Sequence, residues 1–118
     1  MLVDTHAHLQ EDYSDLNVVI QKAANNSVEK IICIGYDYQS SLTAVRLARK
    51  YKEIFAVVGV HPHDAKELNE DILAKLFDLG REHKVVAIGE IGLDYYRNLS
   101  PKEVQQKLLL LSFSWLVN

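Results

Sequence analysis

The chain has 118 residues, of which 48% are hydrophobic and 25% are charged, and its formal net charge is −3 at pH 7. These values are typical of a soluble globular protein of one domain or less, and the negative charge argues against nonspecific coating of nucleic acid, for which proteins are normally basic. No run approaches the ~20 apolar residues of a membrane span, the single cysteine excludes an internal disulfide, and without an export signal we expect a reducing cytoplasm.

Segments with the character of strands alternate with segments that have the apolar periodicity of helices. In chain order, the predicted elements are a strand and loop at 1–9, a helix at 15–27, a strand at 28–36, a helix at 40–51, a strand at 54–60, a helix at 71–83, a strand at 84–93 and a helix that starts near 100. The strands are β-branched and apolar on both faces, which predicts a parallel sheet covered by helices with right-handed crossovers.

Polar residues mark the starts of three predicted helices. Ser40 or Ser41 can cap the second helix and Asn69 the third. Ser100 can cap the fourth, with Pro101 in its first turn.

Two α/β architectures fit this alternation. One is a doubly wound sheet, and the other is a (β/α)₈ barrel, the TIM-barrel type. A barrel typically needs about 250 residues, so this chain would supply about its first four βα units.

Polar side chains gather where three of the predicted strands end. They are His6 and His8 after the first strand, His61 and His63 after the third, and Glu90 and then Asp94 after the fourth. The carboxyl ends of parallel strands meet at one edge of the sheet, and that edge carries the functional groups in folds of this kind.

The spacing of the first two histidines suits a metal ion. Residues i and i+2 of a strand point to the same face, about 6.5 Å apart along the backbone. His6 and His8 can therefore direct ring nitrogens to one point, within reach of Zn–N distances of about 2.0–2.1 Å. Glu90 could add a carboxylate oxygen, and two His with one carboxylate are a known facial set for divalent metals.

Glu90 reaches these histidines only in some topologies. In a flat sheet with sequential strand order, the first and fourth strands lie about 14 Å apart, which excludes a shared ion. Curling the sheet into a barrel shortens the gap, and a doubly wound order of 3-2-1-4 would make the two strands neighbours.

Other residues have ordinary explanations. His83 precedes the fourth strand, so we expect it on the surface at the opposite edge of the sheet. Cys33 lies within an apolar strand, where packing is expected rather than reactivity. The glycines do not form a G-x-G-x-x-G pattern, so a dinucleotide site has no support.

Three motifs, "DTHAHL", "GVHPH" and "GEIGLDYY", occur in that order over most of the chain, from residue 1 to about residue 106. As a set they resemble the TatD family of metal-dependent hydrolases. The resemblance implies a TIM barrel with divalent metals at its C-terminal rim, and deoxyribonuclease activity that removes nucleotides from DNA ends.

The resemblance also implies roles for individual residues. His6 and His8 would bind one metal ion and Glu90 would bridge to a second, the ions being Mg²⁺, Mn²⁺ or Zn²⁺. His61 and His63 would line the site near the substrate phosphate. Within this half of a barrel, the resemblance assigns no catalytic residue beyond the metal ligands, and Asp4 would support the loop rather than bind metal.

The chain departs from the family pattern in its second part. The family supplies two further His ligands and an Asp from later strands, whereas this chain has no His after His83 and no Asp after Asp94. Residues 108–118 read "LLLLSFSWLVN", which lacks a convincing helix face. We therefore expect a single truncated barrel domain over 1–118, with an aberrant tail at 108–118, weak or no activity, and self-association through unpaired sheet edges.

Two alternative functions remain open on the sequence alone. One is an amidohydrolase-like enzyme that acts on a small-molecule amide or ester, since the H-x-H start is shared with that group. The other is a fragment that binds metal without catalysis.

Overall fold

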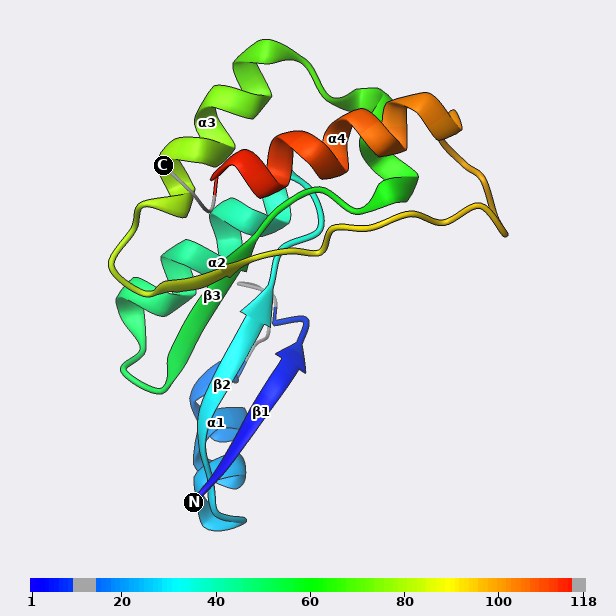
Figure 1. Ribbon diagram of the computed structural model, residues 1–118. Helices are drawn as coiled ribbons and strands as arrows, with labels where there is room; N and C mark the ends of the chain where they lie inside the picture. Colours follow the sequence, from blue (N-terminus) through cyan, green and yellow to red (C-terminus); the bar gives the residue numbers. More distant parts are fainter. Residues whose placement is uncertain (10–14, 116–118) are drawn as a thin grey trace.

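The computed structural model describes residues 1–9 and 15–115, in which strands and helices alternate (Figure 1). In chain order the elements are β1 (Leu2–Ala7), α1 (Leu16–Asn25), β2 (Val28–Ile34), α2 (Tyr38–Lys50), β3 (Ile54–Val58), the 3₁₀ helix η1 (Pro62–Glu67), α3 (Glu70–Gly80), β4 (Val85–Ile88) and α4 (Lys102–Trp115). Every predicted strand and helix is present. The added element, η1, occupies a stretch for which the sequence predicts a loop.

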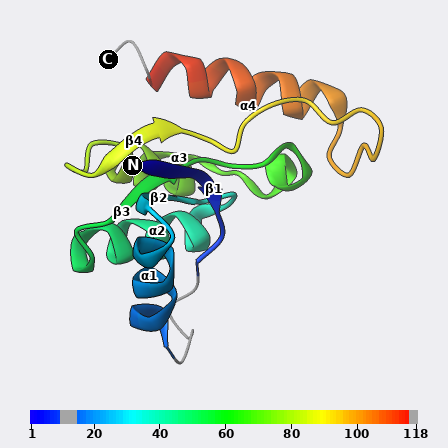
Figure 2. The same cartoon turned by 90° about the horizontal axis from the view of Figure 1, so that it is seen from below.

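The four strands form one parallel sheet in the order β1-β2-β3-β4. This order shows that the doubly wound alternative of 3-2-1-4 is wrong. Helices α1 and α2 lie on the same face of the sheet (Figure 2), as they do in a barrel, whereas a doubly wound fold covers both faces. The chain therefore has the arrangement of four successive βα units of a barrel.

Two groups of buried apolar side chains hold these layers together. The first group joins α1 and α2 to the strands and consists of Leu16, Ile20, Cys33, Ala44, Val45, Leu47, Ala48, Ile54, Ala56 and Val58. The second joins η1, α3 and α4 beyond the carboxyl end of β3 and consists of Val60, Ala65, Leu76 and Leu108. Because η1 and α4 share the second group, the loops that follow β3 and β4 are fixed relative to each other.

The start of α2 differs from the prediction. The helix begins at Tyr38, and Asp37 is the cap: its carboxylate accepts the Ser40 N–H at 2.7 Å, while the Ser40 hydroxyl accepts the Asp37 N–H at 3.0 Å. Ser40 thus serves as the reciprocal partner of a capping box. Ser41 is fully buried inside the helix, so neither serine is the cap.

The other two predicted caps have different outcomes. Asn69 caps α3 as predicted, because its side-chain oxygen accepts the Ile72 N–H at 2.9 Å. The Ser100 hydroxyl instead joins the loop before α4 to η1: it donates to the His63 carbonyl at 2.7 Å and accepts the Lys66 N–H at 3.1 Å.

Residues 108–115, the first part of the predicted aberrant tail, are helical, although Leu110 and Phe113 leave 70% and 51% of their surface exposed. Helix α4 continues to Trp115, with Leu108 and Ser112 buried four residues apart on one face. The Ser112 hydroxyl donates to the Leu108 carbonyl at 2.9 Å, so a polar residue is accommodated in the buried stripe. Trp115 packs against Phe77 of α3, with ring centroids 6.5 Å apart. Residues 116–118 lie outside the described residues.

The two outer strands leave apolar side chains uncovered. Leu2 and Val3 of β1 are 57% and 44% exposed, and Val86 of β4 is 51% exposed. The prediction of strands apolar on both faces is confirmed for β3, for β4 and for residues 31–34 of β2, whereas β1 carries Asp4, Thr5 and His6. Within the sheet, buried residues occur only in the two middle strands, β2 and β3. None of the helices in the described part of the chain combines the length and the apolar character needed to cross a membrane.

Candidate metal centre

The end of strand β1, with His6, and the residue just after the strand, His8, bring two imidazoles together at the carboxyl edge of the sheet. The His6 Nε2 atom lies 3.2 Å from the His8 Nε2 atom, and the two rings meet edge to face with centroids 5.0 Å apart. The Asp4 carboxylate accepts the backbone N–H of His6 at 3.1 Å and so supports the end of the strand. The predicted convergence of the two imidazoles is confirmed.

Glu90 reaches the histidines because the chain after β4 turns across the ends of the neighbouring strands. Gly89 donates its N–H to the Val58 carbonyl and Glu90 donates its N–H to the Gly35 carbonyl, both at 2.9 Å. Gly89 is thereby held at the end of β3, and Glu90 is held just beyond the end of β2. The Glu90 Oε1 atom then lies 3.6 Å from the His6 Nε2 atom, although the strand order is sequential.

His6, His8 and Glu90 form what we call the His–His–Glu triad. Each offers one ligand atom, and these atoms all lie within 4.8 Å of one another. Two donors that each bind a cation at about 2.1 Å, at an angle of about 90–110°, lie about 3.0–3.4 Å apart. The separations of 3.2 Å (His6–His8) and 3.6 Å (His6–Glu90) are close to that range, and the third pair of ligand atoms lies within 4.8 Å. Side-chain adjustment alone would therefore bring all three donors onto one divalent ion.

His61 and His63 lie at the start of η1. The backbone N–H of His61 donates to the Tyr36 carbonyl at 2.7 Å, and the His61 Nδ1 atom accepts the backbone N–H of His63 at 3.2 Å. The two rings have centroids 4.1 Å apart. The ring of Tyr36 also packs against His8, with centroids 5.7 Å apart, so Tyr36 connects the histidine pair to the triad.

His63 has a carboxylate partner, Asp94, which the sequence places at the functional edge of the sheet without assigning it a contact. Its Nε2 atom contacts the Asp94 Oδ2 atom, and the Asp94 Oδ1 atom accepts the Arg97 N–H at 2.9 Å. Both hydrogen bonds lower the pKa of the Asp94 carboxyl, and the bond from the Arg97 N–H has the larger effect. The available signal was a carboxylate four residues beyond Glu90, but the sequence does not indicate that it faces His63.

Gln105 is a second residue that the sequence leaves unassigned. It is fully buried on α4, and its Oε1 atom accepts the Asp94 N–H at 2.8 Å. Its Nε2 atom donates to the Ser100 carbonyl at 2.7 Å and to the Asp94 carbonyl at 3.3 Å. Its neighbour Gln106 is exposed and donates to the Tyr95 hydroxyl, so sequence alone does not distinguish the two glutamines.

Cys33 is 1% exposed and packs in the core as predicted. Its thiol donates to the Leu9 carbonyl at 3.8 Å. Burial raises the pKa of the Cys33 thiol, which disfavours the reactive thiolate.

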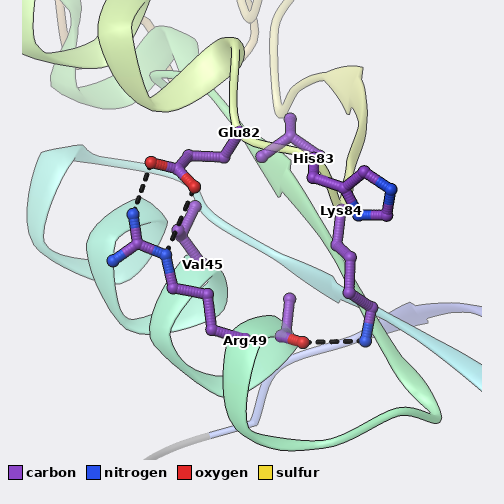
Figure 3. A pocket seen from close by; sticks show the side chains of 7 residues that line it. Val45, Arg49, Glu82, His83 and Lys84 are labelled. Carbon is purple, nitrogen blue, oxygen red and sulfur yellow. Dashed lines mark hydrogen bonds and ion pairs between the residues drawn. The ribbon is translucent and has the colours of Figure 1, made fainter.

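His83 lies on the surface just before β4, also as predicted, beside a pocket of about 240 Å³ (Figure 3). The charged groups of this pocket already have partners. Arg49 pairs with Glu82, and the Lys84 ammonium donates to the Ala48 carbonyl at 2.7 Å. The pocket therefore offers no unpartnered cation to a ligand among these residues.

Comparisons of the sequence and of the fold with known proteins all point to the same protein family. A sequence model described as TatD related DNase matches residues 3–113. YabD of Bacillus subtilis strain 168, described as an uncharacterized metal-dependent hydrolase, is 44% identical over 110 residues, which are 92% of this chain. TatD of Cronobacter sakazakii, described as a 3′-5′ ssDNA/RNA exonuclease, is 38% identical over 92 residues, which are 78% of this chain.

The fold comparison agrees with the sequence comparison. The crystal structure of YJJV, a TatD homologue from Escherichia coli K12, superposes with a TM-score of 0.85 over 97% of this chain at 31% identity. The chain covers 43% of YabD, 35% of the Cronobacter TatD and 46% of YJJV, so it spans less than half the length of these relatives.

Proposed function

Because the chain belongs to the TatD-related DNase family, we propose that it is a divalent-metal-dependent hydrolase that cleaves phosphodiester bonds at the ends of DNA strands. The observation that carries this proposal is the meeting of three side chains at one edge of the sheet: the imidazoles of His6 and His8 lie 3.2 Å apart, and the Glu90 carboxylate, which follows β4, lies 3.6 Å from His6. Two further features support it: a second pair of histidines beside the triad, and a relative described as a single-strand exonuclease.

In this proposal His6, His8 and Glu90 would hold one divalent ion, and Glu90 would also serve as a ligand of a second ion. Mg²⁺, Mn²⁺ and Zn²⁺ all suit a set of imidazole and carboxylate donors. When bound, such ions polarise the phosphodiester and lower the pKa of a coordinated water.

The histidine pair would contact the substrate phosphate. Because the His61 Nδ1 atom accepts a hydrogen bond from the His63 backbone, the proton of a neutral His61 ring is on Nε2. That Nε2–H is a donor suited to a phosphate oxygen. In this proposal the triad binds the metal ion, and the histidine pair binds the phosphate anion of the substrate.

We expect slow but metal-dependent activity from the 118-residue chain, because the described residues provide only three ligand atoms at the triad. With Mn²⁺, a 5′-labelled single-stranded DNA oligonucleotide should be shortened from its 3′ end, and EDTA should stop the reaction. Glu90→Gln should reduce the rate at least about 100-fold, since direct ligands matter more than their supporting residues.

Glu82→Gln is the matched control, because Glu82 undergoes the same chemical change but pairs with Arg49 elsewhere. Equal rates for the Glu90→Gln and unchanged chains would contradict the proposal. Hydrolysis of cyclic amides without nucleotide release would favour the amidohydrolase alternative. Ion binding without turnover of either substrate would favour the non-catalytic alternative.

We also propose that two copies of the chain associate through their outer strands, because β1 exposes both its backbone edge and the side chains of Leu2 and Val3. Sedimentation velocity should show a dimer whose fraction rises with concentration. Val3→Lys should shift the chain toward monomer, whereas Val18→Lys, on an equally exposed site of α1, should not. A monomer at all concentrations would contradict this proposal.

A further inference from the structure

The His63 residue is held at both its backbone and its ring by the segment that leads into α4. Its carbonyl accepts the Ser100 hydroxyl at 2.7 Å, and its Nε2 atom contacts the Asp94 carboxylate. The side chains of His63 and Asp94 are only 23% and 25% exposed. A residue held at its backbone by Ser100 and at its ring by Asp94, both more than 30 residues away in sequence, is oriented more strictly than a surface loop requires.

Asp94 is itself fixed, so it cannot simply rotate away from His63. Its Oδ1 atom accepts the Arg97 N–H at 2.9 Å, and its backbone N–H donates to the Oε1 atom of buried Gln105 at 2.8 Å. Gln105 also donates to the Ser100 carbonyl at 2.7 Å. Gln105 therefore ties together the two residues that contact His63.

This arrangement determines which ring nitrogen of His63 carries the proton. A carboxylate oxygen only accepts hydrogen bonds, so the Nε2 atom that faces Asp94 must be the protonated nitrogen. The Nδ1 atom of His63 makes no hydrogen bond within residues 1–9 and 15–115, which leaves it available to a ligand. In a neutral ring this free nitrogen is an acceptor.

We propose that Asp94 is a positioning residue that fixes His63 in the Nε2–H tautomer, so that the histidine pair presents one N–H donor, from His61, and one nitrogen acceptor, from His63. This inference rests on the proposed function, because it says which hydrogen-bond donor and which acceptor the histidine pair presents to a substrate phosphate and to the hydroxyl or water beside it. Gln105 affects His63 only indirectly, because it bonds to Asp94 and holds that residue in place.

The neighbouring groups do not provide the same constraint. The ring of His61 lies 4.1 Å from that of His63, centroid to centroid, but its Nδ1 atom is already used by the His63 backbone. Asp64 is adjacent in sequence, and its backbone N–H donates to the His61 carbonyl. Among the described residues, only Asp94 has a side chain that bonds a ring nitrogen of His63.

The test is the tautomer of His63, measured by ¹⁵N NMR of the imidazole nitrogens at a pH where the ring is neutral. The unchanged chain should show His63 protonated at Nε2. In Asp94→Asn, the oxygen of the amide remains on the Arg97 N–H, so the NH₂ group takes the place of Oδ2 and faces the ring. Nε2 must then accept, and His63 should switch to the Nδ1–H tautomer.

Asp64→Asn is the matched control and should leave the tautomer unchanged. A neutral His63 protonated at Nδ1 in the unchanged chain would overturn the inference without any variant. Nε2 protonation that persists in Asp94→Asn would overturn it as well. A titration with inorganic phosphate separates this inference from the proposed function. If the tautomers behave as expected but phosphate changes the ¹⁵N chemical shifts of neither His61 nor His63, the role of Asp94 stands. The proposed contact between the histidine pair and the substrate phosphate is then refuted.

Discussion

His6→Ala should weaken the binding of Mn²⁺ to the chain at least about 100-fold, because it removes the donor that lies nearest to both other members of the triad. The remaining His8 and Glu90 cannot enclose an ion, and the site is open to solvent because His6 and His8 are both exposed. Isothermal titration calorimetry with Mn²⁺ measures the change directly.

His83→Ala is the control, because His83 is also an exposed histidine but lies beside the pocket of Figure 3, where the charged groups have other partners. It should bind Mn²⁺ as tightly as the unchanged chain does. Unchanged affinity in His6→Ala, or equal losses in both variants, would place the ion somewhere other than the triad.

Gly59→Ala should destabilise the chain by about 3 kcal/mol and weaken ion binding at the same time. A Cβ atom at position 59 would lie 2.3 Å from the carbonyl oxygen and 2.5 Å from the carbonyl carbon of Gly89. These are backbone atoms, so the clash cannot be relieved by rotating a side chain. Ser41 holds Gly59 from the other side, with hydrogen bonds to its N–H at 3.2 Å and to its carbonyl at 3.3 Å.

The clash would displace the residue that precedes Glu90 and thus the carboxylate itself. Urea denaturation measures the stability change, and calorimetry with Mn²⁺ measures the binding. Gly80→Ala is the matched control: its Cβ would meet two side-chain atoms, Cδ1 of Ile88 at 3.4 Å and Cγ2 of Val58 at 3.9 Å. It should change stability by no more than about 1 kcal/mol. Similar results for the two variants would show that the close approach of β3 to Gly89 does not position Glu90.

The strand and helix pattern was predictable because each strand is an apolar run and each helix an apolar stripe. Strand order was not, since 3-2-1-4 and a barrel both bring the first and fourth strands within reach of one ion. The structure decides for the barrel type through its sequential strand order. Glu90 still reaches the histidines through a detail that no pattern encodes: Gly89 and Glu90 bond to Val58 and Gly35, across the ends of two strands.

Some residues of the candidate site could likewise be predicted from the sequence, and others could not. His6 and His8 were predictable because a spacing of two on a strand fixes their common face. Asp94 and Gln105 were not, because their roles depend on where the loop before α4 lies relative to η1. The buried stripe that includes Ser112 was missed for a related reason, since a serine that bonds its own helix is compatible with a core but resembles an interruption in sequence.

Anomalous diffraction from crystals of the chain grown with Mn²⁺ tests most directly whether the triad holds a divalent ion. We expect an anomalous peak about 2.0–2.2 Å from the Nε2 atoms of His6 and His8 and from a carboxylate oxygen of Glu90. A peak bound to other residues, or side chains of the triad turned apart in well-ordered density without a peak, would contradict it.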